Sequence, residues 1–487
     1  MKIFRKVKKT QKALPFLGSY IKGKFQKVNK KRLQQKHKSP ADFEDLIFYW
    51  DEHPCLDLNS LCFSGKKAQR KWSQTPFPER VKKLKKLKPI IKKNIKNWGE
   101  LISRETGKAL WESEGEVKAL LLKLDFTLEE ALKRIKTQSL PPYGQIRFKS
   151  RGLCLVIGPF NFPMHLPFGQ ILPALLAGNA VIFKASEKAP ASAQALTGAF
   201  DQIGLESGLY QLVQGGGKIS KKLCNQNLID AIFFTGSFET GDKIKQSLVK
   251  DYNKLLALEM GGYNSSLVWD DADLNLAVQE CLKACFWTSG QRCSSCSQII
   301  LHKKIASEFI KLFLEKAKQL KVNHWSQNPW MGSLIDKKSL QRFFKFQKQI
   351  KKAGGQFLLE GKQLYKEKGY YVSPGIYKMA FDKNSLIGTQ ETFTPQVIIY
   401  ETRQLKEAVE LINHSGFGLS LSVFSKDKKV KEEMFQCSKV GLVYYNLASV
   451  GASSYLPFGG VGKSGNDRPA GAFAIDSCVI PMAEKGF

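Results

Sequence analysis

The chain has 487 residues, which is long enough for two or three domains with buried cores. Its composition, 43% hydrophobic and 11% aromatic, excludes a disordered chain. No run of about 18 apolar residues occurs, so we expect no membrane span, and the basic first residues lack the apolar core of a secretory signal. The ten cysteines are therefore expected to be reduced thiols of a cytoplasmic protein.

The net charge of +33 arises from 76 Lys and Arg against 43 Asp and Glu. Two stretches are especially basic: residues 1–40, with 14 basic and no acidic residues, and residues 82–96. Apolar residues at helical spacing in 82–96 predict one helix with lysines on its outer side and a kink at Pro89. Because no aromatic residues interleave with the basic ones, nucleic-acid binding is not expected; steering of an anionic substrate is an alternative.

In the order of the chain, residues 41–75 show no clear periodicity, and residues 76–136 have a helical pattern with a break at 105–108. From residue 151, continuously apolar runs alternate with helical stretches. This is typical of strands buried on both faces and predicts an open, parallel α/β sheet of Rossmann type, with ligands at the carboxyl ends of its strands. The predicted strands are 152–158, 180–186, 209–216, 230–237 and 254–262.

A second α/β region is predicted over about 263–440. Its apolar runs are 266–270, 298–302, 396–401 and 420–425. The tail from about residue 470 is short enough to add one edge strand to a neighbour.

Two strand ends have the features of a nucleotide site. In FFTGSFETG, Gly236 directly follows a strand and Ser237 can cap the next helix, whose free N–H groups suit a pyrophosphate. In FKASE, Lys184 and Glu187 can bond adjacent ribose hydroxyls, and the carboxylate disfavours a 2′-phosphate, hence NAD over NADP. An ordinary strand–helix turn and a solvated loop explain these two pieces equally well.

Two further polar residues follow apolar strands. Asn161, in the Pro-flanked turn of GPFNFP, has an amide that can donate to a developing oxyanion, or that makes only its own turn. Glu259 ends the apolar run of LALEMGG, where burial would raise its pKa and suit it as a general base.

Cys293, in FWTSGQRCSSC, has several possible roles. A zinc site with Cys296, Cys281 and Cys285 has an unusual spacing and no nearby histidine, so no metal is predicted. A redox pair with Cys296 is disfavoured because a helical segment precedes it. A buried structural thiol and a nucleophile both fit, and the nucleophile would need a carboxylate base and a nearby cationic nicotinamide in place of histidine.

These pieces together resemble the NAD(P)-dependent aldehyde dehydrogenase superfamily. The motifs GPFNFP, FKASE, FTGS-x3-G, LEMGG, GQRC, ETFTPQ and PFGG occur in the family's order, and the resemblance covers the chain from about residue 20 to the tail. It implies that Cys293 attacks an aldehyde, that Asn161 and the backbone N–H of Cys293 hold the oxyanion, and that Glu259 activates water to hydrolyse a thioester. The implied cofactor is NAD.

The resemblance also implies a set of NAD-binding residues and a domain division. The expected cofactor residues are Gly158, Pro159, Phe160, Lys184, Ser186, Glu187, Gly215, Phe234, Gly236, Ser237, Gly241, Glu391 and Phe393. The expected parts are a basic tail (1–19), an NAD-binding domain (20–136 and 149–261), a catalytic domain (262–456) and oligomerisation segments (137–148 and 470–487) of a homodimer or homotetramer.

The segments NFPMHLPFGQILPALLAGNAVIFKASE and PFGGVGKSGNDRPAGAFAIDSCVIPMA are similar to succinylglutamate semialdehyde dehydrogenases of bacterial arginine catabolism. The implied substrate, N-succinylglutamate 5-semialdehyde, carries two carboxylates, for which Arg468 and Phe458 are candidate contacts. The alternatives are another semialdehyde oxidised in the same way, or a cysteine thioester or ester hydrolase that binds no nucleotide.

Three residues depart from the family pattern. Thr394 stands where the family has glycine, and a β-branched residue adopts a positive φ only at a cost, so strain is expected there. Ala185 replaces a proline, and Tyr263 replaces a small or amide residue.

Overall fold

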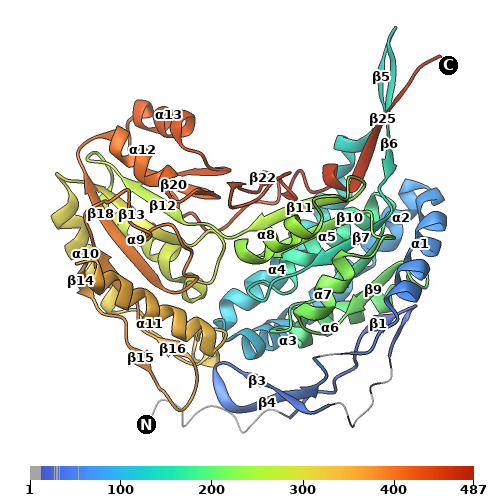
Figure 1. The fold of residues 1–487 in the computed structure, drawn as a ribbon, viewed down its shortest axis with the longest axis horizontal. Coiled ribbons are helices and arrows are strands. Elements are labelled where there is room, and N and C mark those ends of the chain that lie inside the picture. Colours follow the sequence, from blue (N-terminus) through green and yellow to red (C-terminus); the bar gives the residue numbers. More distant parts are fainter. Residues whose placement is uncertain (1–11, 27, 29–30, 32, 53, 487) are drawn as a thin grey trace.

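The structure is a computed structural model that describes residues 12–26, 28, 31, 33–52 and 54–486. Residues 1–11 of the predicted basic tail therefore lie outside the described residues. Two α/β units lie side by side, and a narrow arm projects from one of them (Figure 1).

The first sheet confirms the predicted Rossmann-type strands. Its order is β11-β10-β7-β8-β9-β1-β2, and the first five of these strands are parallel and almost entirely buried. Strands β8 and β9 are added on one side of β7, and the chain then returns to add β10 and β11 on the other side of β7. The strand order therefore reverses between β7 and β10, and sheets of this type bind ligands at such a point. The strands are β1 (Tyr20–Ile21), β2 (Lys24–Phe25), β7 (Leu153–Ile157), β8 (Ala180–Lys184), β9 (Tyr210–Val213), β10 (Ala231–Gly236) and β11 (Leu255–Met260).

Helices cover both faces of this sheet (Figure 1). They are α1 (Leu58–Gln74), α2 (Phe77–Lys85), α3 (Leu87–Thr106), α4 (Leu110–Glu129), α5 (His165–Leu176), α6 (Pro190–Gln202), α7 (Gly217–Cys224) and α8 (Phe238–Ser247). The single kinked helix predicted over 82–96 is wrong, because α2 ends at Lys85 and α3 begins at Leu87. Pro89 lies in the first turn of α3, where its missing N–H leaves no hydrogen bond unmade.

Regular structure also occurs where the sequence showed no periodicity. β3 (Gln35–Ser39) pairs with β4 (Asp42–Trp50), and α1 packs on the first sheet. The buried face of α1 includes Cys62, Gly65, Ala68 and Gln69, residues too small or too polar to mark a hydrophobic stripe. A Cβ at Gly65 would lie 2.7 Å from Leu153, so glycine permits the close approach of α1 to β7.

The second sheet has the order β14-β17-β18-β13-β12-β20-β21 and contains all the strands predicted for 263–440. They are β12 (Asn264–Val268), β13 (Cys296–His302), β14 (Gln356–Leu359), β17 (Gly375–Lys378), β18 (Gln396–Thr402), β20 (Ser420–Phe424) and β21 (Leu442–Tyr445). The covering helices are α9 (Leu274–Phe286), α10 (Ala306–Lys318), α11 (Lys337–Lys352), α12 (Leu405–His414) and α13 (Lys428–Cys437).

The projecting arm is a three-stranded antiparallel sheet of β5 (Gln138–Leu140), β6 (Gly144–Ser150) and β25 (Val479–Glu484). A long connection, 457–471, returns from the second α/β unit to the first. There the backbone N–H of Met260 donates to the carbonyl of Ser464 at 2.9 Å, and the N–H of Leu258 donates to the side chain of Asn466 at 2.7 Å. Within the described part of the chain, no helix is both long and apolar enough to cross a membrane.

Candidate active site

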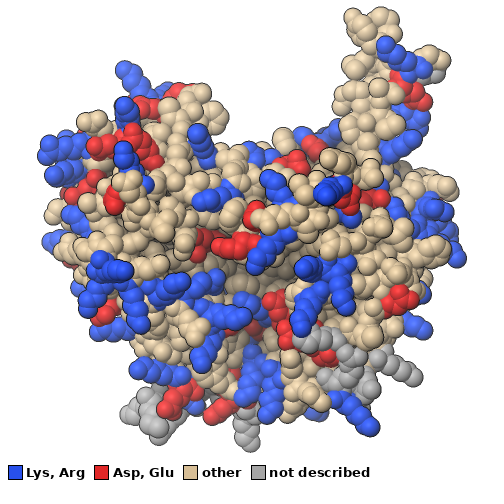
Figure 2. Space-filling model, in the orientation of Figure 1, with Lys and Arg blue, Asp and Glu red and all other residues tan. Residues whose placement is uncertain are grey.

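A cleft of about 860 Å³ begins at the carboxyl ends of the first sheet and extends to Cys293. Basic side chains gather around the hollow in the face shown in Figure 2. The predicted residues that line the cleft come from both α/β units, so folding brings together motifs more than 200 residues apart. They are Gly158, Pro159, Phe160, Asn161, Lys184, Ser186, Glu187, Phe234, Gly236, Ser237, Glu259, Cys293, Glu391 and Phe393.

Cys293 follows a strained turn at the end of α9. Thr288, Ser289 and Gly290 adopt φ values of 55°, 53° and 68°, and the two non-glycine residues cost roughly 1–3 kcal/mol each in this conformation. Side-chain hydrogen bonds hold the turn: Thr288 Oγ1 donates to Glu112 at 2.7 Å and Ser289 Oγ to the carbonyl of Gly332 at 2.9 Å. The turn brings Cys293 to the lining of the cleft, where it also packs against a small apolar cluster.

The electrostatic surroundings keep this thiol protonated at rest. Burial raises the pKa of Cys293. The nearby carboxyl groups of Glu259 and Glu391 raise this pKa further, whereas Arg292 lowers it. A thiolate is the reactive form, so the nucleophile requires a ligand or a base in the cleft to become ionised.

Glu259 lies near the end of β11 and is 1% exposed. Neither of its carboxylate oxygens has a hydrogen-bond partner among the described residues. Burial raises its pKa well above the usual value, while Arg468 opposes that shift. A buried carboxyl group without a partner is costly, and a water molecule or substrate proton in the cleft would satisfy it.

Asn161 is joined directly to the loop that bears Cys293. Its Nδ2 donates to the carbonyl of Gln291 at 2.9 Å, and its own carbonyl accepts from Lys108 Nζ at 2.8 Å. The amide carries two N–H groups, so one is left for a substrate oxygen. Gln291 itself accepts from the N–H of Ile335 at 3.0 Å, which ties this loop to the second α/β unit.

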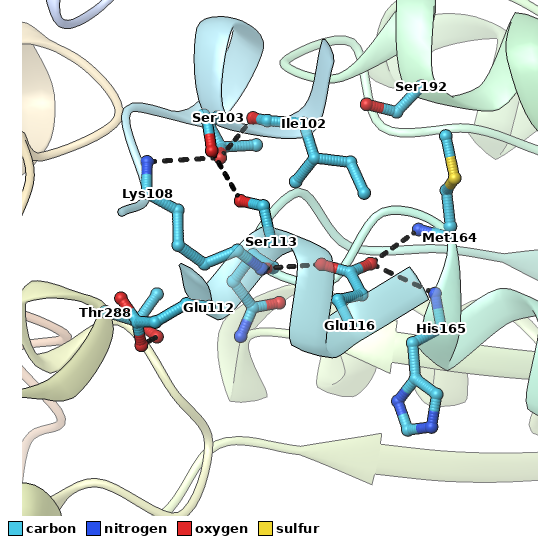
Figure 3. Close-up of polar contacts among 12 residues, drawn as sticks. Ile102, Ser103, Lys108, Glu112, Ser113, Glu116, Met164, His165, Ser192 and Thr288 are labelled. Atoms are coloured by element: carbon cyan, nitrogen blue, oxygen red, sulfur yellow. Dashed lines mark hydrogen bonds and ion pairs between the residues drawn. The ribbon is translucent and has the colours of Figure 1, made fainter. Parts of the chain in front are cut away.

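Helix α4 supports both loops through buried charges that sequence reasoning missed (Figure 3). Lys108 Nζ pairs with Glu116 at 2.5 Å, and Glu116 accepts from the N–H groups of Met164 and His165 at 3.0 and 3.1 Å. One turn earlier, Glu112 accepts from Arg292 at 2.7 Å. Charged residues at core positions of a helical pattern, in RETGKALWESEGE, are the only signal of this network in the sequence.

At the carboxyl ends of the first sheet, Ser237 caps a helix as the sequence predicted. The helix is α8, and Ser237 accepts from the N–H of Thr240 at 3.4 Å. Lys184 is buried, and its ammonium donates to the carbonyl of Ala185; burial lowers its pKa to about 8, against the influence of Glu187. Further basic residues of the lining were not predicted: Lys188, Lys221, Lys243 and Arg342.

Glu391 and Phe393 lie where the cleft approaches Cys293. Glu391 accepts from the N–H of Gly262 at 3.2 Å, and burial raises its pKa to about 8. The ring of Phe393 meets that of Phe160 edge-on with centroids 5.9 Å apart, which closes the wall between the two units.

Two predicted glycines do not line the cleft. A Cβ at Gly241 would lie 2.4 Å from the sulfur of Met260, so this glycine lets α8 pack against β11. Gly215 has a φ of +126°, and a Cβ there would lie 2.9 Å from Pro54. Both glycines serve close packing behind the cleft.

Among the described residues there is no group of three or more His, Cys, Asp or Glu side chains that could hold a metal ion. All ten cysteines are free, and Cys281, Cys285 and Cys296 are buried beside the second sheet.

The sequence and the fold of the chain were compared with those of known proteins. The model of the aldehyde dehydrogenase family matches residues 34–480. The chain belongs to the aldehyde dehydrogenase family. It is 33% identical over 472 residues to N-succinylglutamate 5-semialdehyde dehydrogenase of Legionella pneumophila, with 96% of this chain and 94% of the relative covered. It is 33% identical over 446 residues to the protein of that name in Acinetobacter baylyi, with 90% and 91% covered.

Solved structures of aldehyde dehydrogenases have the same fold. A putative aldehyde dehydrogenase from Burkholderia cenocepacia superposes with a TM-score of 0.89 at 26% identity, covering 96% of each chain. Betaine aldehyde dehydrogenase from Staphylococcus aureus, in complex with NAD+, superposes with a TM-score of 0.90 at 25% identity, covering 96% of this chain and 94% of that one.

The two candidate substrate contacts of this aldehyde dehydrogenase lie beside Cys293 and Glu259 but outside the lining of the cleft. Phe458 belongs to a small apolar cluster against which Cys293 packs. Arg468 donates to the carbonyl of Gly460 at 2.7 Å, and its charge acts on Glu259.

The strain expected at Thr394 is absent. The positive φ of this segment, 53°, falls on the preceding residue, Phe393. Thr394 is buried, and its hydroxyl accepts from Gln396 Nε2 at 2.9 Å. Threonine therefore fits here without a backbone penalty. The other two departures, Ala185 and Tyr263, are buried, and the hydroxyl of Tyr263 has no partner among the described residues.

Proposed function

We propose that this enzyme uses NAD to oxidise N-succinylglutamate 5-semialdehyde to N-succinylglutamate, as a step of arginine catabolism. The relatives at 33% identity that carry this name support the choice of substrate. The single observation that carries the chemistry is that Cys293, Glu259 and Asn161 share one cleft with the proposed NAD-binding residues.

The cleft fits NAD by its shape and its charges. Its volume of about 860 Å³ lies within the range of small-molecule sites, and its lining combines apolar residues with basic, acidic and hydroxyl side chains. Ser237 caps a helix whose N-terminus suits a pyrophosphate, and Lys184 and Glu187, which line the same cleft, are the proposed ribose contacts. When bound, NAD supplies a hydride acceptor, which side chains alone cannot provide.

The shared position of Cys293, Glu259 and Asn161 in one cleft supports the following proposed roles. Cys293 adds to the aldehyde carbon, and the free N–H of Asn161 and the backbone N–H of Cys293 stabilise the oxyanion of the thiohemiacetal. Glu259 then takes a proton from the water that hydrolyses the thioester on Cys293. Its lack of any partner in the resting structure leaves its oxygens available for that water.

The arm of β5, β6 and β25 is proposed to join the subunits of a homodimer or homotetramer. Large apolar side chains on it are exposed, including Leu140, Tyr143, Ile480 and Met482, which supports an interface. We also propose the domain division expected from the sequence, with NAD bound by residues 20–136 and 149–261, and a cytoplasmic location.

The test is NADH formation, measured by absorbance, with a panel of aldehydes: N-succinylglutamate, glutamate and succinate semialdehydes and an uncharged aldehyde. The proposal predicts the highest kcat/KM with N-succinylglutamate semialdehyde and no turnover in Cys293→Ser. A higher kcat/KM with another member of the panel would overturn the choice of substrate. Ester cleavage without any NADH formation would overturn the reaction.

A further inference from the structure

Lys123 of α4 is a buried lysine without a counterion. It is 8% exposed, and none of the described residues forms an ion pair or hydrogen bond with its ammonium group. Burial lowers its pKa to about 8, and no carboxylate opposes that shift. A lysine held in the protein interior without a compensating anion is unfavourable, so its position requires an explanation.

The ammonium lies against α5, next to the active-site loop. A Cβ built on Gly169 would lie 2.7 Å from Lys123 Nζ and 2.9 Å from its Cδ, so the lysine occupies the space that glycine leaves. Leu166, one turn before Gly169 on the same face of α5, lines the catalytic cleft. The ammonium is therefore about one helical turn from the cleft that contains Asn161 and Cys293.

A second basic group, His165 at the start of α5, lies near enough for the charge of Lys123 to act on it. Burial lowers its pKa well below the usual value, and the charges of Lys123 and Lys108 lower it further. Its ring points away from Glu116 and makes no hydrogen bond with the described residues (Figure 3). A neutral imidazole still carries one N–H that can donate to an oxygen.

Glu116, whose carboxylate lies beside the backbone of His165, is already used. Glu116 pairs with Lys108 through one oxygen and accepts the N–H groups of Met164 and His165 through the other. Arg468 lies at a different place, beside Glu259. No carboxylate of the described residues opposes the lowered pKa of Lys123 or of His165.

We propose that Lys123 and His165 bind a carboxylate of the substrate, one that is remote from its aldehyde carbon. The inference rests on the proposed function and deepens it, because it assigns residues to one of the two carboxylates that distinguish N-succinylglutamate semialdehyde from simple aldehydes. A carboxylate accepting from Lys123 and His165 compensates the buried charge and fixes the substrate with its aldehyde toward Cys293.

The first test compares Lys123→Met with wild type on two aldehydes. Methionine keeps the length of the side chain and removes the charge. Loss of one partner of a buried charge pair predicts a rise in KM for N-succinylglutamate semialdehyde of about 30-fold or more. The kcat/KM for hexanal, which has no carboxylate, should remain unchanged. Lys118→Met, which removes an exposed lysine from the same helix, is the matched control and should behave as wild type.

A second variant and a binding measurement test the site even if Lys123→Met does not fold or the semialdehyde is not the substrate. Gly169→Ala keeps the lysine but displaces its ammonium, and should also raise KM for the semialdehyde alone. Titration calorimetry with the product, N-succinylglutamate, should show weaker binding in both variants. If wild type binds this product but does not oxidise the semialdehyde, the proposed function fails while the carboxylate site stands. Unchanged KM and product affinity in both variants would overturn the site.

Discussion

Glu259 approaches Cys293 closely enough to influence its thiol, and yet neither oxygen of this buried carboxyl group has a partner among the described residues. Burial raises the pKa of Cys293 most, and Glu259 adds to that shift. The resting site therefore holds a protonated thiol beside a carboxyl group that is free to bind water. This arrangement suits a base that acts on the thioester after the thiol has reacted.

Glu259→Gln is expected to make Cys293 more reactive toward iodoacetamide. Removing the acidic group lowers the raised pKa of the thiol, so a larger thiolate fraction is present at any pH below that pKa. At about pH 8.5, the ordinary pKa of a thiol, alkylation should be about 3- to 10-fold faster than in wild type. The rate of labelling at Cys293, followed by mass spectrometry, is the measurement. Slower labelling would instead make Glu259 the base that ionises the thiol.

Glu187→Gln is expected to raise the use of NADP. The carboxylate lines the cleft beside Lys184, where it repels a 2′-phosphate, while Lys188 and Lys221 remain to attract one. We expect the ratio of kcat/KM for NADP to that for NAD to rise about tenfold, as for about 1.4 kcal/mol of repulsion removed. Glu239→Gln, in the first turn of α8 and outside this cleft, should leave the ratio unchanged. An equal ratio in the two variants would contradict the assignment of Glu187.

Lys108→Met is expected to destabilise the protein strongly. The variant leaves Glu116 charged and buried without its cation, which costs about 3–5 kcal/mol. Lys88→Met is the control, because the Lys88–Asp125 pair is about a third exposed, with side chains 31% and 34% accessible, and its loss costs under about 1 kcal/mol. Urea unfolding of the two variants measures the difference. Equal midpoints would mean that the buried pair contributes no more than the exposed one.

Thr394→Gly, which restores the glycine of the family pattern, should not improve NAD binding. The positive φ lies at Phe393, so threonine carries no strain to relieve. Loss of its hydrogen bond with Gln396 should lower stability by about 1 kcal/mol. Thr394→Val, which removes only the hydroxyl, should lose stability in the same way. A clear fall in the KM for NAD in the glycine variant alone would contradict this account.

The sheets were predictable because their strands are buried on both faces. β7 and β8 are continuous apolar runs, which need no knowledge of their neighbours to be recognised. Helix α1 was not recognised, because its buried face is built partly from Gly65, Ala68 and polar Gln69. On this face of α1, small residues let the helix backbone approach β7 closely, in place of packing by large apolar side chains. Such packing depends on the partner strand and cannot be recognised from the sequence of α1 alone.

The catalytic residues could be proposed from the order and spacing of the sequence motifs. The buried charged residues that position the catalytic loops could not. In the sequence, Lys123 resembles an ordinary surface lysine of a helical segment, and Lys108 falls at the predicted break over 105–108. Their burial follows from the packing of α4 on α5, which places Lys108 against Glu116 and Lys123 against Gly169. Similarly, the sequence indicated a positive φ in this segment, but it was expected at Thr394, whereas the structure has it at Phe393.

The most direct test of the central claim is to trap the acyl group on Cys293. Glu259→Gln should be mixed with NAD and N-succinylglutamate semialdehyde, quenched in acid, digested and examined by mass spectrometry. Since general-base catalysis contributes about 10²–10⁴-fold, hydrolysis should be slow enough for the thioester to accumulate. We predict one N-succinylglutamyl group per subunit on the peptide that contains Cys293, formed together with one equivalent of NADH. NADH formation with no acyl group on Cys293, or with the group on another cysteine, would contradict the account.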